Sequence, residues 1–197
     1  MTEKIIIKAE RLTKQFGHFT ATDHITFEVR EGEIFGFLGA NGAGKTTAMR
    51  MLCGLSQPSD GWATVAGYDV ATQHEQVKQN IGYMSQKFSL YDDLTVEENF
   101  TLFGGIYGMS RKEMKEKTTR LLEELDFASE RKTKVKSLPL GWKQKLAFSL
   151  AIFHEPKIVF LDEPTGGVDP VTRRQFWELI YQAADRNITV FVTTHYM

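Results

Sequence analysis

The chain has 197 residues, of which 42% are hydrophobic and 25% are charged, proportions that are ordinary for a soluble globular protein. Its 24 Lys and Arg residues nearly balance 25 Asp and Glu residues, and the formal net charge of −1 argues against a polyanion-binding protein. The single cysteine, Cys53, excludes an internal disulfide, and its apolar neighbours in RMLCGL favour a buried small side chain over a reactive thiol.

The apolar runs are too short to cross a membrane. Runs such as IVFL at 158–161 and VFV at 190–192 fall far below the roughly 20 residues that a spanning helix needs. The N-terminal stretch MTEKIIIKAERL carries charges where a signal peptide needs a sustained apolar run. Any role at a membrane is therefore expected to go through a partner.

The first half of the chain predicts strands and short helices in alternation. Residues 5–8 and 25–29 are rich in β-branched side chains, and IFGFL at 34–38 is a continuous apolar run that stops at glycine, which predicts a buried strand. The further elements predicted here are a helix at 45–52, short strands with a turn at 61–70, a polar helix at 72–80 and a strand at 81–86.

The middle of the chain changes character. From about residue 95 to residue 127 apolar side chains recur at helical spacing. The charged run RKEMKEKTTRLLEEL within it is interpreted as a solvated helix face with i,i+4 ion pairs, in preference to a binding patch. Alternation then returns, with a helix from about 142 to 153, a strand at 158–161, a helix from about 170 to 186 and a strand at 188–194.

The stretch FGFLGANGAGKTTAMRML at 35–52 matches G-x-x-x-x-G-K-[ST] at every fixed position. Glycines allow backbone N–H groups to curl around an anion, and the following helix directs its positive dipole end to the same point. A glycine-rich turn could simply join a strand to a helix, but the complete match favours a nucleoside triphosphate site. The predicted nucleotide-binding residues in this loop are Gly39, Ala40, Asn41, Gly42, Ala43, Gly44, Lys45, Thr46 and Thr47.

A second group of polar residues follows the apolar strand in KIVFLDEP at 157–164. Open α/β sheets place their chemistry at such strand ends. Asp162 is suited to hold Mg²⁺, and Glu163 could orient or deprotonate the water that attacks the γ-phosphorus. Without the phosphate loop, the two acids could equally be a solvated strand end.

With these motifs in place, the chain resembles the ATP-binding subunits of ABC transporters over essentially all of its length. The order and spacing of the motifs carry the resemblance as much as the motifs themselves. GYMSQ resembles the Q-loop, SLPLGWKQKLAFSLAI stands where the family has its Leu-Ser-Gly-Gly-Gln signature, and GGVDP resembles the D-loop. VTTHYM resembles the switch-histidine loop, and LTKQFGHF stands where the family stacks an aromatic ring on adenine.

The resemblance implies roles for individual side chains. Phe16 would stack on adenine, with Phe19 as the alternative. Gln86 would contact the metal or the attacking water and lie near the permease interface, and His195 would contact the γ-phosphate and position water. The implied catalytic residues are Lys45, Glu163 and His195, and the implied metal-binding residues are Thr46, Gln86 and Asp162.

The chain departs from the family pattern in two places. In the signature region Pro139 stands for serine, Leu140 for the first glycine and Trp142 for glutamine, and the following helix is expected to begin near Trp142. The sequence also stops two residues after His195, which predicts a C-terminally truncated domain. The signature and D-loop residues expected to serve the opposite subunit's site are Leu138, Pro139, Leu140, Gly141, Trp142 and Asp169.

The implied architecture is α/β: a P-loop NTPase core with a mostly parallel sheet, an N-terminal antiparallel β part and a helical insertion. The core would comprise residues 1–86 and 155–197, and the helical subdomain residues 87–154. The implied function is that of a motor subunit using ATP and Mg²⁺ at the cytoplasmic face of the inner membrane. Its partners would be transmembrane permease subunits and a second nucleotide-binding domain, identical, different or fused in tandem. LTVEENF and GGVDP are most similar to ABC-2 type exporters.

Two other function classes fit the sequence less well. A soluble ABC-type ATPase acting on ribosomes or DNA would be expected to carry basic extensions, a long linker or a coiled-coil insertion, and the near-neutral charge argues against it. A small-molecule kinase with a phosphate loop has no need of the segment at 138–146. The sequence therefore predicts a transport ATPase that does not bind nucleic acid.

Overall fold

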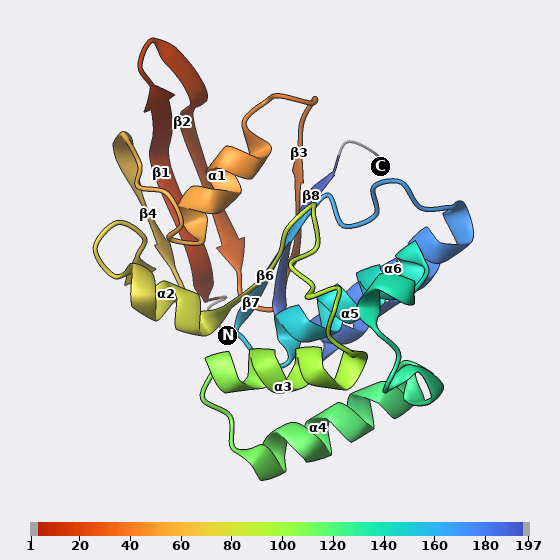
Figure 1. Cartoon of the computed structure of the whole chain (residues 1–197). Coiled ribbons are helices and arrows are strands. Elements are labelled where there is room, and N and C mark those ends of the chain that lie inside the picture. Colours follow the sequence, from red (N-terminus) through yellow and green to blue (C-terminus); the bar gives the residue numbers. More distant parts are fainter. Residues whose placement is uncertain (1–3, 195–197) are drawn as a thin grey trace. The chain divides into compact units, whose positions relative to one another are not determined.

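The computed structural model describes residues 4–194, and the chain divides into two compact units (Figure 1). Unit 1 contains the residues up to 86, residues 156–164 and the residues from 178 onward, and unit 2 contains residues 87–155 and 165–177. The sequence-based division assigned residues 165–177 to the core, whereas here they group with the helical unit. The domain division as a whole stays a prediction.

The first sheet of unit 1 is antiparallel, with the strand order β2-β1-β4-β5. Strands β1 (Ile5–Phe16) and β2 (Phe19–Arg30) form one long hairpin. Both strands are therefore longer than the strands expected at 5–8 and 25–29. Pairing continues through polar residues because backbone N–H and C=O groups bond whatever the side chain, with register shifts along the way. The other strands are β4 (Asp60–Val65) and β5 (Tyr68–Asp69).

The second sheet of unit 1 is parallel throughout, with the order β3-β8-β7-β6. Its strands are β3 (Ile34–Leu38), β6 (Ile81–Met84), β7 (Ile158–Asp162) and β8 (Thr189–Thr194). Central strand β7 is buried at every position, but β3 pairs only with β8 and is partly exposed. The expected burial of 34–38 is therefore wrong: the apolar run lies at a sheet edge.

Helix α1 (Lys45–Leu52) follows the phosphate loop and packs in the core shared by the two sheets. Its Met49, Met51 and Leu52 side chains are fully buried in the same cluster as side chains of β1, β4, β7 and β8. This packing places the N-terminus of α1 at the carboxyl edge of the parallel sheet. Helix α2 (His74–Asn80), short and polar as expected, leads into β6.

Unit 2 is helical and has a hydrophobic cluster of its own, which includes Phe100, Leu122, Leu146 and Phe153. Its helices are α3 (Val96–Ile106), α4 (Arg111–Glu124), α5 (Leu140–Ile152) and the first part of α6 (Pro170–Asp185), with 3₁₀ turns at Ala128–Glu130 and Val135–Ser137. Helix α5 begins at Leu140, two residues before the expected start near Trp142, because Pro139 occupies the N-cap, where its missing N–H has no cost.

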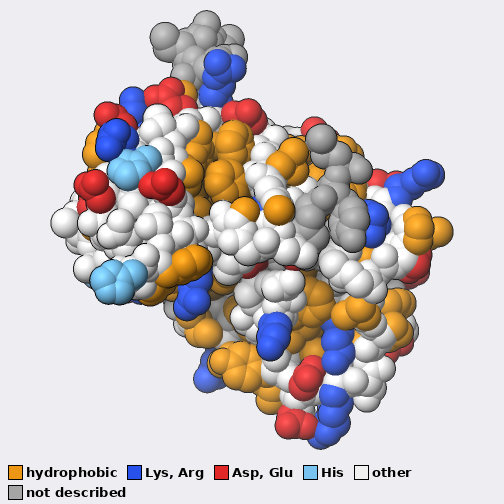
Figure 2. Space-filling model, turned by 90° about the horizontal axis from the view of Figure 1, so that it is seen from above, with side chains coloured by type: hydrophobic (Ala, Val, Ile, Leu, Met, Phe, Trp, Pro, Cys, Tyr) orange, Lys and Arg blue, Asp and Glu red, His pale blue; other side chains and the backbone are white. Residues whose placement is uncertain are grey.

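The mixed α/β fold class with a parallel sheet, an antiparallel β part and a helical insertion is confirmed. Within residues 4–194, no helix combines the length and the apolar character that crossing a bilayer requires. On the face seen in Figure 2, basic and acidic side chains are interspersed, as the near-neutral composition predicts.

Candidate functional site

The phosphate loop joins β3 to α1, and its residues 40–43 are exposed. Gly44 takes the N-cap position of α1 with φ +81°, and Ala48 N donates to Gly44 O at 2.8 Å to begin the helix. A side chain at Gly44 would also place its Cβ 1.9 Å from Ala21 O in β2. Glycine is required here by both conformation and space.

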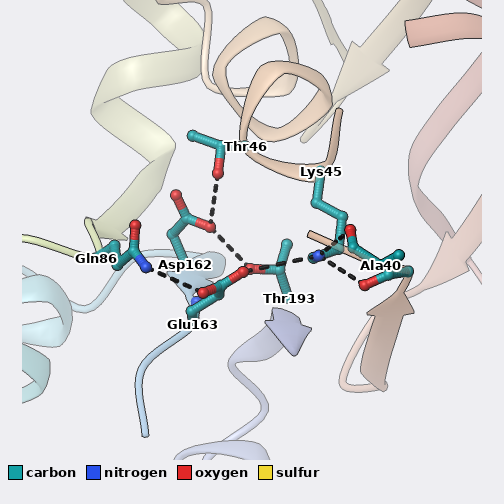
Figure 3. A network of polar contacts seen from close by, with 8 residues as sticks. Ala40, Lys45, Thr46, Gln86, Asp162, Glu163 and Thr193 are labelled. Atoms are coloured by element: carbon teal, nitrogen blue, oxygen red, sulfur yellow. Dashed lines mark hydrogen bonds and ion pairs between the residues drawn. The ribbon is translucent and has the colours of Figure 1, made fainter. Parts of the chain in front are cut away.

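Lys45 turns its side chain back over this loop. The side chain is 5% exposed, and its Nζ donates to Gly39 O at 2.7 Å and to Ala40 O at 2.9 Å. The same Nζ lies 3.7 Å from Glu163 Oε1 (Figure 3). A buried cation is thus held at the loop by two carbonyls and a carboxylate, which suits a residue that has to meet phosphate oxygens.

Asp162 is the last residue of β7 and is 2% exposed. Its Oδ1 accepts hydrogen bonds from Thr46 Oγ1 at 3.2 Å and from Thr193 Oγ1 at 2.8 Å. A carboxylate beside a hydroxyl provides hard oxygen ligands, the donor set that Mg²⁺ prefers in phosphoryl-transfer sites. The residues present therefore fit a magnesium ion.

Glu163 follows with a positive φ of +49°, which directs its side chain differently from that of Asp162. Its Oε2 accepts from Gln86 Nε2 at 3.0 Å, and its backbone N–H donates to Thr193 Oγ1 at 3.0 Å. Figure 3 shows the carboxylate between Gln86 on one side and Lys45 on the other. The fold therefore brings Lys45, Thr46, Gln86, Asp162 and Glu163 into one cluster within unit 1.

The Asp162 carboxylate contributes to the raised pKa values of two neighbouring side chains, Cys53 and Tyr83. Burial raises the pKa of the Cys53 thiol well above its ordinary value, and the Asp162 carboxylate adds to the effect. Burial and then Asp162 raise the pKa of Tyr83 to about 12. Cys53 is fully buried, as the sequence predicted, so it is a packing residue of the core.

The other predicted residues are outside this network of contacts or outside the described part of the chain. Phe16 and Phe19 face each other across the tip of the β1–β2 hairpin and are 56% and 63% exposed. Lys14 Nζ lies 5.2 Å from the centroid of the Phe16 ring. Adenine stacking stays a prediction for Phe16, with Phe19 as the alternative, and His195 lies outside the described residues.

The altered signature has a definite arrangement within unit 2. Leu138 is buried, Pro139 caps α5 without a side-chain hydrogen bond, and Leu140 is 47% exposed at the first helical position. The Trp142 ring lies 4.4 Å from that of Phe127, and it packs against the hydrophobic cluster. Trp142 is therefore a partly buried residue that covers the core of unit 2.

Gly141 and the expected D-loop residue Asp169 both lie next to Thr172 of helix α6. A Cβ at Gly141 would lie 2.7 Å from Thr172 Cγ2, so α5 and α6 approach closely at this glycine. Asp169 caps α6: its Oδ1 accepts from Val171 N and Thr172 N, and its Oδ2 accepts from Thr172 Oγ1. These bonds, the Thr172 hydroxyl first, lower the pKa of Asp169. Thr172 thus contacts both motifs.

Sequence reasoning gave no role to Thr193, which bonds both acids of the cluster. One signal could have found it: a polar residue at the carboxyl end of an apolar parallel strand, just before Thr194 and His195. That signal becomes specific only once β8 is known to lie beside β7, with Thr193 in register with Asp162.

Comparison with known proteins agrees with this geometry. The model of the protein family described as "ABC transporter" matches residues 22–166, well over half of the chain. This chain belongs to the ABC transporter family. The matched residues include the phosphate loop, Gln86, the segment at 138–142 and the Asp162–Glu163 pair.

The curated relatives of this ABC domain include ATP-binding proteins of a multidrug transporter and of an antibiotic-resistance system. The probable multidrug ABC transporter ATP-binding protein YbhF of Escherichia coli K12 is 50% identical over 192 residues, which are 98% of this chain and 33% of that protein. The linearmycin resistance ATP-binding protein LnrL of Bacillus subtilis is 35% identical, and the match covers 98% of this chain and 62% of LnrL. The chain thus spans about a third of YbhF and about three fifths of LnrL.

Solved structures show the same fold. An ATP-binding subunit of an ABC transporter superposes with a TM-score of 0.85 at 27% identity, covering 96% of this chain and 79% of that one. The ADP-bound ATP-binding cassette MJ1267 superposes with the same TM-score at 23% identity, covering 98% and 82%.

Proposed function

We propose that this ABC domain binds and hydrolyses Mg·ATP and drives export through separate membrane-spanning permease subunits, as an ABC-2 type exporter does. The observation that carries the proposal is the polar cluster at the carboxyl edge of the parallel sheet. There Thr46 and Asp162 lie 3.2 Å apart, and the Glu163 carboxylate lies within 3.7 Å of Lys45 Nζ. The names of YbhF and LnrL support export over the ribosome- or DNA-directed alternative.

The side chains divide the chemistry among them. The exposed loop residues 40–43 and the N-terminus of α1 suit the binding of phosphate oxygens, and Lys45 would transfer its hydrogen bonds from Gly39 O and Ala40 O to them. Thr46, Asp162 and Gln86 would hold Mg²⁺, which neutralises charge on the phosphates when bound. Glu163 would orient the attacking water and take its proton, while Gln86 holds the carboxylate in place.

The proposal extends to a second nucleotide-binding domain. In the closed pair, the segment at 138–142 and Asp169 would serve the site of the opposite domain. Here Pro139 has neither a hydroxyl nor an N–H, Leu140 adds bulk, and the Trp142 side chain packs inside unit 2. We therefore propose that the physiological partner is a different domain with an intact signature, separate or fused in the same natural chain, and that both lie at the cytoplasmic face of the inner membrane.

The proposal is tested by removing one charge at Glu163. Glu163→Gln keeps the size of the side chain but cannot take a proton, so ATP hydrolysis should fall by about a hundredfold or more while ATP binding is retained. Lys45→Ala should instead abolish the binding of a fluorescent ATP analogue. Steady-state ATPase assays and fluorescence titrations of the full-length protein distinguish the two effects.

Glu75→Gln serves as the matched control, because Glu75 pairs with Lys78 on the surface of α2 and makes no contact with the cluster. It should bind and hydrolyse ATP like the wild type. Hydrolysis at the wild-type rate by Glu163→Gln would show that this carboxylate has no part in the reaction.

A further inference from the structure

Thr193 lies between the two acids of the candidate site. It belongs to β8, its side chain is completely buried, and it is in register with Asp162 on the neighbouring strand β7. Thr193 Oγ1 lies 2.8 Å from Asp162 Oδ1 and 3.0 Å from Glu163 N. A single oxygen atom thus contacts two consecutive residues for which different roles are proposed (Figure 3).

The chemistry of the three groups determines the direction of these hydrogen bonds. An ionised carboxylate only accepts and a backbone N–H only donates, whereas a hydroxyl has one proton and two lone pairs. Thr193 therefore donates to Asp162 Oδ1 and accepts from Glu163 N–H. Thr46 donates to the same Oδ1 at 3.2 Å, so two hydroxyls fix the orientation of the Asp162 carboxylate.

The bond to Glu163 N–H acts on a backbone that needs support. Glu163 has φ +49°, a region that non-glycine residues seldom adopt and that persists only where surrounding contacts hold it. This conformation directs the Glu163 carboxylate toward Gln86 Nε2 at 3.0 Å and Lys45 Nζ at 3.7 Å. Loss of the Thr193 hydroxyl would remove the hydrogen bond from Glu163 N–H, which is one of the contacts that hold this backbone conformation.

We propose that Thr193 is a positioning residue for ATP hydrolysis. Its hydroxyl orients Asp162 for the metal and Glu163 for the attacking water, and it links both to β8. This inference rests on the proposed ATPase function. A purely structural role, in which the hydroxyl only satisfies buried polar atoms, would change stability and leave the reaction unaltered.

The experiment compares Thr193→Val with a matched substitution on the same strand. Thr189 is also completely buried in β8, and its hydroxyl accepts from Gly32 N at 2.9 Å, at the strand end away from Asp162. Thr189→Val thus removes one buried hydroxyl of equal size without touching the site. Thr193→Ser restores the hydroxyl, and Thr193→Ala removes it without adding a methyl group, in case the valine variant does not fold.

In the full-length protein, Thr193→Val should lower kcat about tenfold to a hundredfold, with KM for Mg·ATP changed much less. Thr193→Ser should stay within a few-fold of the wild type. Thr189→Val should lower the melting temperature as much as Thr193→Val does but leave kcat unchanged. In the presence of ATP, Mn²⁺ binding measured by electron paramagnetic resonance should weaken several-fold in Thr193→Val and Thr193→Ala, but not in Thr193→Ser or Thr189→Val.

Two results would overturn the positioning role. One is wild-type kcat and Mn²⁺ affinity in both Thr193→Val and Thr193→Ala, and the other is an equal loss in Thr189→Val. A wild-type protein that binds Mn²⁺ and ATP but does not hydrolyse ATP would contradict the proposed function alone, since the Mn²⁺ measurement still tests Thr193.

Discussion

Gly44 shows how one residue can hold the phosphate loop in place. Its φ of +81° lies in the left-handed region, and its missing Cβ leaves room for Ala21 O of β2. Thr22 Oγ1 also donates to Gly44 O, at 3.4 Å. The loop is therefore supported from the antiparallel sheet as well as by α1.

We expect Gly44→Ala to destabilise unit 1 by clearly more than the roughly 1–2 kcal/mol that a left-handed conformation alone costs an L-residue, because the new Cβ would also lie 1.9 Å from Ala21 O. Gly67→Ala is the matched control, since Gly67 has φ +86° and no atom within 4 Å of its Cβ position. Urea unfolding gives both stabilities, and only Gly44→Ala should weaken binding of an ATP analogue. Equal losses of stability would contradict the steric argument.

Helix α3 illustrates how an element is started by its own sequence. Thr95 Oγ1 accepts from Glu98 N at 3.2 Å, and Glu98 Oε2 accepts from Thr95 N at 2.7 Å, which is a complete capping box. Asn99 then bonds Tyr91 through both its oxygen and its nitrogen. The segment before α3 is thereby tied to the first turn of the helix.

Thr95→Ala should lower the free energy of unfolding by about 1 kcal/mol, since it leaves the Glu98 N–H without its capping oxygen. Thr101→Ala in the same helix is the control: that hydroxyl donates only to Glu97 O, so its loss should be neutral or slightly stabilising. Denaturant unfolding of both variants measures the difference, and a Thr95→Ala protein as stable as the wild type would rule out the cap.

The capping box should also depend on pH. The hydrogen bond from Thr95 N, and then that involving its side chain, lowers the pKa of Glu98. A carboxyl group whose pKa is lower in the folded state contributes stability above its ordinary pKa of about 4.3, and this is lost as pH falls through the folded value. The difference in stability between the wild type and Glu98→Gln, whose side chain has the same size but cannot ionise, should therefore shrink below about pH 4.

At the scale of the whole molecule, the two units contribute different parts of the proposed motor. Unit 1 contains the described residues that we propose for nucleotide and metal binding, and unit 2 contains the segment at 138–142 and Asp169, which caps α6. Within unit 2, Trp142 packs against Phe127, and Gly141 lies against Thr172. The departures from the family signature are thus accommodated by a regular core.

Restoring the signature tests whether this domain requires a different partner. Pro139→Ser with Leu140→Gly, and the same pair with Trp142→Gln, should raise the ATPase activity of a homomeric full-length preparation roughly tenfold. Each regained hydrogen bond to a charged phosphate contributes about 1.5–3 kcal/mol. The double variant keeps the Trp142–Phe127 packing and so separates a loss of stability from the gain in activity. No rise in either variant would mean that the natural loop already works in a homodimer.

Much of the architecture could be predicted from the sequence because its signals are local. The match at 39–46 predicted a phosphate loop followed by a helix at 45–52, and the helix α1 spans Lys45–Leu52. The alternation of apolar strands with helices predicted the α/β class. Glycine conformations, capping residues and hydrophobic periodicity each depend on a few neighbouring residues, so they can be read before the fold is known.

The tertiary structure decided what depends on distant segments. Thr46 and Asp162 are 116 positions apart in the sequence but are joined by a hydrogen bond. Thr193 and Asp162 are 31 positions apart, and they meet because parallel pairing of β7 with β8 aligns the ends of these strands. Only this pairing revealed the role we propose for Thr193. The edge position of β3 likewise follows from the strand order, which depends on backbone pairing between distant segments. An apolar run cannot specify this order, since a partly exposed strand can be as apolar as a buried one.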